Sequence, residues 1–211
     1  MSPRDDVRAR IHGLYGLADA QASGGDPVAL AAALLAGGCR LIQLRCKGWS
    51  VGDRLAAARD IRARCAAVGA TFIVNDHPEV AAAVDADGVH VGQLDAPAAQ
   101  VRRALGPDRI LGRSTHDPEQ LEAALVHADY VAFGPVFATG NVSRPKGVRG
   151  LDALALASAR VAGRAPLVAI GGITAGNVAT VRAAGADSWA VIGAVAAASD
   201  PVAATRALLT P

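Results

Sequence analysis

The chain has 211 residues, a length typical of one domain with a single sizeable core. The net charge is only +2 and there is no basic block, which argues against nucleic acid as the main partner. The three cysteines form no C-x-x-C pair, and no run approaches the ~18 apolar residues of a membrane span. These features predict a soluble protein of the reduced cytoplasm, without a membrane segment.

Short apolar runs alternate with helical segments along the whole chain. Each helical segment carries start or stop signals, such as the N-cap and proline pairs Asp26-Pro27, Asp117-Pro118 and Asp200-Pro201. Eight β-then-α units favour one α/β domain over 1–211, a single (β/α)8 TIM barrel, with an open doubly wound sheet as the alternative. The predicted strands are 12–18, 40–45, 71–75, 87–91, 109–113, 129–133, 167–170 and 188–192.

The second predicted strand ends in three polar side chains, Gln43, Arg45 and Lys47. They share one face because side chains alternate along a strand, so they point together at the mouth of the barrel. An arginine fork and a lysine charge suit a polyanion such as pyrophosphate. The alternative is a solvated surface pair whose partners are Asp53 or Asp60.

The third and fourth predicted strands each end near a carboxylate, Asp76 and Asp95. On neighbouring parallel strands these side chains emerge at the same edge, where they can share a Mg²⁺ ion, and Asn75 can donate its amide to a ligand. Each carboxylate has an alternative interpretation as the N-cap of the helix expected to begin at Pro78 or Pro97.

The fifth and sixth predicted strands lead into hydroxyl and imidazole groups. Ser114 can bind phosphate, and His116 can serve as an acid or base, although a lone histidine beside an N-cap is more often structural. His90, inside an apolar strand, is expected to be a core residue with satisfied hydrogen bonds. Thr139 opens a polar loop that is expected to close over a ligand, with an ordinary exposed basic loop as the alternative. The loop carries Asn141, Ser143, Arg144, Lys146 and Arg149.

Glycines follow the last two predicted strands, at Gly171-Gly172 and at Gly193 after Ile192. Glycine lets backbone N–H groups approach an anion, and the loops after strands 7 and 8 are the usual phosphate site of such barrels. The alternative is a pair of tight turns, and a helix is expected to begin near Thr174. With the cationic strand ends, this predicts two anion-binding regions, for two phosphorylated groups or one long one.

Taken in order, six motifs resemble the thiamine phosphate synthase family from Leu14 to Val195. The motifs are Gln43-Leu44-Arg45-x-Lys47, Asn75-Asp76, Gly88-Val89-His90-Val91-Gly92-Gln93-x-Asp95, Ser114-Thr115-His116, Gly134-Pro135-Val136-Phe137-x-Thr139 and Ala169-Ile170-Gly171-Gly172-Ile173. The resemblance implies a transferase on a (β/α)8 barrel that requires magnesium. Such an enzyme joins a pyrimidine pyrophosphate to a thiazole phosphate, through loss of pyrophosphate, a pyrimidine-methyl cation and attack by the thiazole nitrogen.

The resemblance also implies roles for individual residues. Asp76 and Asp95 would hold magnesium, and the catalytic residues would be Arg45, Lys47 and Ser114. The pyrimidine pyrophosphate would be bound by Gln43, Arg45, Lys47, Asn75 and Ser114. The thiazole phosphate would be bound by Thr139, Gly172, Ile192 and Gly193.

The chain departs from the family pattern at two places. Cys46 stands where the family usually has an acidic residue, and Asn141 and Val142 stand where it has a hydroxyl residue and a pyrophosphate-binding lysine. Either Lys146 or Arg144 reaches back to bind the substrate instead, or pyrophosphate binding is weaker.

Two other functions compete with the synthase. A thiazole tautomerase of the same superfamily is an isomerase that needs a histidine and no metal, which suits His116 but leaves Asp76 and Asp95 unused. A non-catalytic paralogue would bind a thiamine-related phosphate as a sensor or carrier. In each case the expected partners are phosphorylated small molecules, with a homo-oligomer possible.

Overall fold

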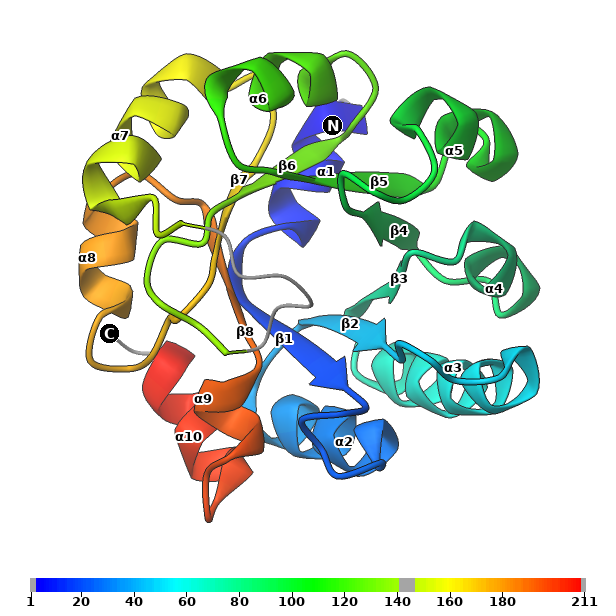
Figure 1. The fold of residues 1–211 in the computed structure, drawn as a ribbon. Coiled ribbons are helices and arrows are strands. Elements are labelled where there is room, and N and C mark those ends of the chain that lie inside the picture. The colour runs from blue at the N-terminus through cyan, green and yellow to red at the C-terminus, as the bar shows by residue number, and fades with distance from the viewer. Residues whose placement is uncertain (1–2, 141–146, 210–211) are drawn as a thin grey trace.

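The computed structural model describes residues 3–140 and 147–209, and its centre is a closed barrel of parallel strands (Figure 1). Each strand pairs with its neighbour in sequence, and β1 also pairs with β8, where Gly13 lies opposite Ser188. The predicted (β/α)8 barrel is therefore confirmed, and the open sheet is excluded. The strands are β1 (Gly13–Asp19), β2 (Leu41–Arg45), β3 (Thr71–Asn75), β4 (Gly88–Val91), β5 (Ile110–Thr115), β6 (Tyr130–Phe133), β7 (Leu167–Ile170) and β8 (Ser188–Val191).

Apart from α1, the helices lie around the outside of the barrel (Figure 1). Their bounds are α1 (Pro3–Arg10), α2 (Pro27–Gly37), α3 (Val51–Ala67), α4 (Pro78–Ala83), α5 (Ala98–Leu105), α6 (Pro118–Leu125), α7 (Gly150–Val161), α8 (Val178–Ala183), α9 (Gly193–Ala196) and α10 (Pro201–Leu209). The sequence did not predict α1 or the short α9. In the described ranges, none of the helices combines the length and apolar character that crossing a bilayer requires.

Side-chain caps explain where several helices begin. Asp26 accepts a hydrogen bond from the Ala29 N–H, and Asp117 and Asp200 cap α6 and α10 in the same way. Ser50 caps α3 through the Asp53 N–H. Proline follows each of the three aspartates, where its missing N–H is not needed.

One predicted helix start is wrong by several residues. The helix expected near Thr174 begins at Val178, because Asn177 takes the N-cap position and its side chain accepts the Thr174 N–H at 2.8 Å. That hydrogen bond turns the segment before the helix. At α5 the error is one residue, since Pro97 is the N-cap and the helix begins at Ala98.

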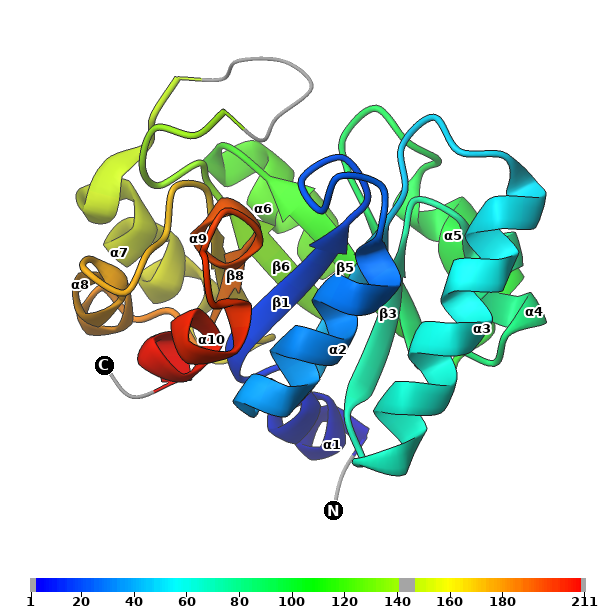
Figure 2. The same ribbon diagram turned by 90° about the horizontal axis from the view of Figure 1, so that it is seen from below.

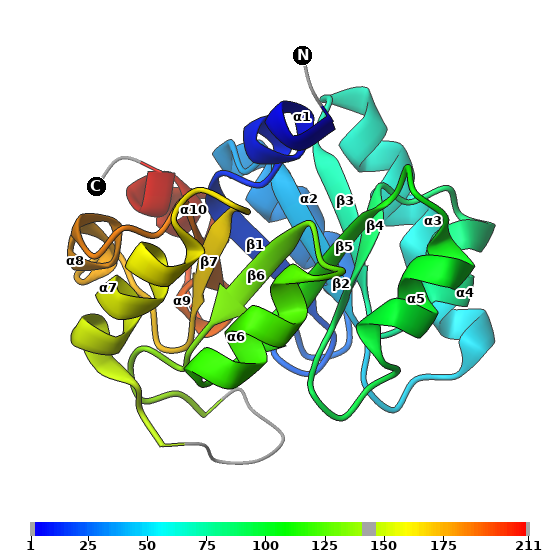
Figure 3. The same ribbon diagram turned by 90° about the horizontal axis from the view of Figure 1, so that it is seen from above.

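The core has two layers. The larger one lies between strands and helices, and the smaller one fills the barrel with residues such as Tyr15, Leu41, Ile73 and Tyr130. Helix α1 lies at the end where the strands begin, and Ile11 just after it is fully buried in this inner cluster (Figure 2). The loops that follow the strands gather at the opposite end (Figure 3). That end of the barrel is consequently the open one.

Candidate active site

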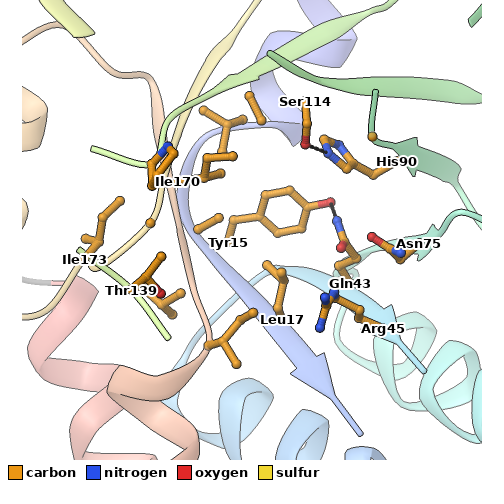
Figure 4. Close-up of a pocket in the computed structure, with 18 of the residues that line it drawn as sticks. Tyr15, Leu17, Gln43, Arg45, Asn75, His90, Ser114, Thr139, Ile170 and Ile173 are labelled. Atoms are coloured by element: carbon orange, nitrogen blue, oxygen red, sulfur yellow. Dashed lines mark hydrogen bonds between the residues drawn. The ribbon is translucent and has the colours of Figure 1, made fainter. Parts of the chain in front are cut away.

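A pocket of about 410 Å³ opens at the carboxyl ends of the strands (Figure 4). Apolar side chains such as Leu17, Ile170 and Ile173 line one part of it, and Gln43 and Arg45 lie on the other (Figure 4). Every sequence-predicted site residue inside the described ranges lines this pocket. These residues are Gln43, Arg45, Lys47, Asn75, Asp76, Asp95, Ser114, Thr139, Gly172, Ile192 and Gly193.

The cationic part of the pocket comes from the end of β2. Arg45 forms an ion pair with Asp19, and Lys47 Nζ lies 3.8 Å from Asp76 Oδ2. The alternative partners Asp53 and Asp60 are therefore wrong. Both cations face the pocket, so they are placed to meet an anion.

Asp19 is a site residue that the sequence analysis missed. It ends β1, is only 3% exposed, and its carboxylate also accepts the Ala22 N–H at 2.8 Å. A buried carboxylate with fixed partners holds the Arg45 guanidinium in one orientation. Its position after an apolar run, like those of Asp76 and Asp95, was the signal that could have revealed it.

The interpretation of Asp76 and Asp95 as helix caps is wrong. The N-cap positions are His77 for α4 and Pro97 for α5, and neither helix has a side-chain cap hydrogen bond. Asp95 instead accepts the Gly92 N–H at 2.7 Å, within its own loop. Asp76 has a left-handed backbone, with φ of 64°, and its N–H donates to the His90 carbonyl. Both carboxylates therefore remain available to the pocket.

The two carboxylates interact and titrate differently. Burial, together with the hydrogen bond and charge of Asp95, raises the pKa of Asp76 to about 6. Burial also acts to raise the pKa of Asp95, but hydrogen bonds from Asp76 and the Gly92 N–H outweigh it, and the pKa of Asp95 is lowered. Near pH 7 both groups are therefore mainly ionised, which places two neighbouring negative charges in the pocket.

The donor set fits a hard divalent cation such as Mg²⁺. Magnesium is usually held by one or two carboxylates together with water and substrate phosphates, rather than by a full protein cage. Throughout 3–140 and 147–209, no group of three or more His, Cys, Asp or Glu side chains is arranged to hold a metal. Asp76 and Asp95 thus suit an ion whose other ligands come from the substrate and solvent.

His90 and Ser114 lie together on the floor of the pocket (Figure 4). His90 Nε2 is 2.8 Å from Ser114 Oγ, and its Nδ1 is 2.9 Å from Tyr130 Oη. Burial and the nearby Arg113 charge lower the pKa of His90 to about 4, so the ring is neutral near pH 7. The expectation of a hydrogen-bonded core histidine is confirmed, and the ring in addition borders the pocket.

His116 and the loop after β6 form a further part of the wall. His116 Nδ1 lies 2.6 Å from the Gly134 carbonyl, and both His116 and Thr139 line the pocket. The predicted contacts of Asn141 and Lys146 lie outside the described residues, as does Val142.

The glycines after β7 serve a tight turn as well as the pocket. Gly171 and Gly172 have φ of 95° and 66°, a region that favours glycine, and a Cβ on Gly172 would overlap the Ala138 carbonyl. Gly193 begins α9 directly after Ile192, where the first N–H groups of a helix have no intrahelical partner. Both segments present backbone to the pocket at the usual phosphate position of such barrels.

Gly172→Ala is expected to lower the free energy of unfolding by about 2–3 kcal/mol, because it adds backbone strain and a clash with Ala138. Urea denaturation measures the change. Gly52→Ala is the matched control: within α3 its Cβ would meet only Ser50 Oγ at 3.8 Å, so the free energy should stay the same or rise. Equal losses in the two variants would contradict the prediction.

Cys46, between the two cations, points away from the site. It is 5% exposed within the core between strands and helices, and burial raises the pKa of its thiol to about 12. The thiol is therefore neutral and adds no charge to the pocket.

Comparison with known proteins agrees with this geometry. The family model for thiamine monophosphate synthase matches residues 14–195. A thiamine-phosphate synthase of Laribacter hongkongensis is 46% identical over 176 residues, 83% of this chain and 82% of that protein. One of Anaeromyxobacter dehalogenans is 46% identical over 198 residues, 93% of this chain and 86% of the relative.

A solved structure extends the comparison to the fold. Thiamine phosphate pyrophosphorylase from Pyrococcus furiosus superposes with a TM-score of 0.86 at 34% identity, covering 95% of each chain. The matched segment 14–195 contains every described residue that lines the pocket. On this evidence the chain belongs to the thiamine monophosphate synthase family.

Proposed function

We propose that this chain is a magnesium-dependent thiamine-phosphate synthase, a transferase that joins a hydroxymethylpyrimidine pyrophosphate to a thiazole phosphate with release of pyrophosphate. Its family membership supports the activity. The observation that carries the proposal is the pairing of Asp76 and Asp95 beside Arg45 and Lys47 in one pocket. Such a group suits the departure of a pyrophosphate leaving group.

In this proposal the two substrates bind at different parts of the pocket. Arg45, Lys47 and Ser114 bind and orient the pyrophosphate, while Gln43 and Asn75 hold the pyrimidine. Asp76 and Asp95 would hold Mg²⁺, which supplies positive charge for the leaving group when bound. The thiazole phosphate meets the Thr139 hydroxyl and the backbone at Gly172, Ile192 and Gly193. No protein nucleophile is needed, because the thiazole nitrogen attacks the pyrimidine-methyl cation.

The wider setting is also part of the proposal. We place the protein in the cytoplasm as one barrel domain over 1–211, acting on phosphorylated small molecules. A second copy of the chain is the candidate macromolecular partner, and sedimentation analysis would detect a homo-oligomer.

The deciding experiment is a coupling assay with both substrates and Mg²⁺. Formation of thiamine phosphate that stops with EDTA supports the synthase. The tautomerase remains the second candidate because His116 lines the pocket. Thiazole isomerisation that survives EDTA, with no thiamine phosphate formed, would replace the synthase by the isomerase. Tight product binding without turnover, seen by calorimetry, would indicate a non-catalytic carrier.

Metal affinity is expected to fall as the pH falls below about 6. Asp76 must lose its proton to bind a cation, and its pKa is raised to about 6, so affinity should drop by about tenfold per pH unit below that value. Titration with Mn²⁺ as a paramagnetic substitute for Mg²⁺ measures the affinity. In Asp76→Asn the remaining affinity should lose this pH dependence, and an unchanged profile would contradict the assignment.

A further inference from the structure

A row of hydrogen bonds crosses the barrel along the lining of the pocket. Gln43 Nε2 donates to Tyr15 Oη at 2.7 Å, and Tyr15 Oη lies 2.9 Å from Tyr130 Oη. Tyr130 Oη then lies 2.9 Å from His90 Nδ1, and His90 Nε2 lies 2.8 Å from Ser114 Oγ. These five residues come from five strands, and we call them the floor chain. Figure 4 shows the hydrogen bonds at its two ends as dashed lines, one between Gln43 and Tyr15 and one between His90 and Ser114.

The interior of the barrel is shaped to hold this chain. Tyr130 is fully buried, its ring stacks on His90 with centroids 5.4 Å apart, and it meets Tyr15 edge-on at 6.2 Å. Gly112 lies opposite both His90 and Tyr130 in the sheet register, and a Cβ there would overlap the Tyr130 ring. Tyr130 can therefore take this position only because residue 112 is a glycine, which has no side chain.

Counting hydrogens fixes the direction of the chain. The Gln43 amide nitrogen can only donate, so Tyr15 accepts from it and must place its own hydrogen elsewhere. Tyr15 is 1% exposed, and the Tyr130 oxygen is the remaining acceptor in the floor chain. Tyr130 in turn donates to His90 Nδ1. The opposite order would leave the Tyr15 hydrogen buried without a partner.

The neutral His90 ring carries one hydrogen, which must then lie on Nε2. That hydrogen is donated to Ser114 Oγ, so the hydroxyl hydrogen of Ser114 is left for the pocket. At the other end, the Gln43 amide nitrogen bonds Tyr15, and the side-chain carbonyl oxygen of Gln43 takes no part in that hydrogen bond. One end of the chain therefore presents a donor and the other an acceptor.

We propose that Tyr130 and His90 are positioning residues: Tyr130 holds His90 as its Nε2–H tautomer, and His90 thereby makes Ser114 a hydrogen-bond donor to an anionic substrate oxygen. Tyr130 is fully buried and does not line the pocket, so it can act only through the lining residues that it contacts, His90 and Tyr15. This inference rests on the proposed function, since the leaving pyrophosphate is the anion that Ser114 would meet. The same chain leaves the Gln43 oxygen to accept from an N–H group of the pyrimidine substrate.

Two readouts test the proposal. Long-range ¹⁵N–¹H spectra of ¹⁵N-histidine-labelled protein report the tautomer of each of the five histidines, and His90→Gln assigns the His90 signals by their loss. Steady-state kinetics of Tyr130→Phe and Tyr15→Phe then compare the removal of one hydroxyl at neighbouring places in the chain. Thr115→Val is the control outside the chain, because it removes the fully buried hydrogen bond from Thr115 to the Ala132 carbonyl.

The proposal expects His90 to be the Nε2–H tautomer in the unaltered protein and in Tyr15→Phe, and a mixture of tautomers in Tyr130→Phe. Tyr130→Phe should lower kcat by about 10- to 100-fold, a loss comparable to that seen when the hydrogen-bond partner of a metal-binding histidine is removed. Tyr15→Phe should act mainly on KM for the pyrimidine substrate, through Gln43, and Thr115→Val should leave both constants unchanged.

Other results would overturn the proposal. One is an Nδ1–H tautomer of His90 in the unaltered protein, and another is an equal loss of kcat in the two tyrosine variants. A kcat loss in Thr115→Val as large as in Tyr130→Phe would show that the loss in Tyr130→Phe comes from general destabilisation of the barrel and not from the His90 tautomer. The spectra need no substrate, so a protein that shows the Nε2–H tautomer but no coupling would contradict the proposed function and not the floor chain.

Discussion

Asp76→Asn is expected to lower the rate of magnesium-dependent coupling by about a thousandfold. The substitution removes one of the two carboxylates available to the metal, and several kcal/mol of leaving-group stabilisation correspond to about three powers of ten in rate. Asparagine tolerates the left-handed backbone that Asp76 adopts, so the fold should be kept. The coupling assay, repeated over a range of Mg²⁺ concentrations, measures the loss.

The same variant should be more stable than the unaltered protein when no metal is present. The folded-state pKa of Asp76 is raised to about 6, so its ionisation opposes folding at neutral pH and ceases to do so at low pH. At pH 8 the free energy of unfolding should rise by about 1–3 kcal/mol in Asp76→Asn, and the gain should vanish near pH 4. Urea denaturation in EDTA at both pH values checks the sign.

Asp85→Asn is the matched control for both measurements. Asp85 also has a left-handed backbone, with φ of 52°, but it is exposed and pairs with Arg109 outside the pocket. The rate and the stability should both stay near the original values. A loss of coupling in Asp85→Asn as large as in Asp76→Asn would contradict the metal-binding assignment.

Arg45→Lys is the second variant expected to have a large effect, a loss of about a hundredfold in kcat/KM for the pyrimidine pyrophosphate. The guanidinium pairs with buried Asp19 and can also face the substrate, whereas an ammonium group has no planar fork and cannot serve both. Disturbing a buried charge pair typically costs 2–5 kcal/mol. Steady-state kinetics with varied pyrimidine substrate measures the loss.

Arg164→Lys provides the comparison for that variant. Arg164 makes two hydrogen bonds of 2.9 Å to the Glu122 carboxylate, but the pair is exposed and far from the pocket in the fold. The kinetic constants of Arg164→Lys should be unchanged.

Asp19→Asn should lower kcat/KM for the pyrimidine pyrophosphate as Arg45→Lys does. A fully active Asp19→Asn would show that Asp19 does not orient Arg45.

The strands and the pocket could be predicted because both depend on local pattern. Each apolar run has a polar residue at its end, and a parallel barrel brings all such ends to one rim. Arg45, Asp76 and Ser114 therefore meet without any contact being known beforehand. The pairing of Arg45 could not be chosen correctly, because Asp19 lies 26 residues away and only the barrel brings it closer than Asp53.

Two of the features that were missed depend on long-range contacts. The segment that forms α1 is charged and shows no apolar pattern. The buried role of Ile11 becomes evident only in the folded barrel, where its side chain joins the inner cluster. Tyr15 and Tyr130 are 115 residues apart, and nothing in either neighbourhood indicates that their hydroxyls meet. The start of α8 at Val178 was misplaced for a local reason: Asn177 takes the N-cap position, in a turn closed by the hydrogen bond from the Thr174 N–H to its side chain.

The pairing of β1 with β8 also means that the barrel can close only when nearly the whole chain has been made. The Ser188 hydroxyl donates to the Gly13 carbonyl across 175 residues of chain, and Trp189 Nε1 donates to the Leu208 carbonyl in α10. A chain growing on the ribosome has therefore made β2 to β5, with the whole cationic and carboxylate side of the pocket, long before β8 exists. The loops proposed to hold the thiazole phosphate are synthesised last, so the closed pocket can form only after β8 has been made and has paired with β1.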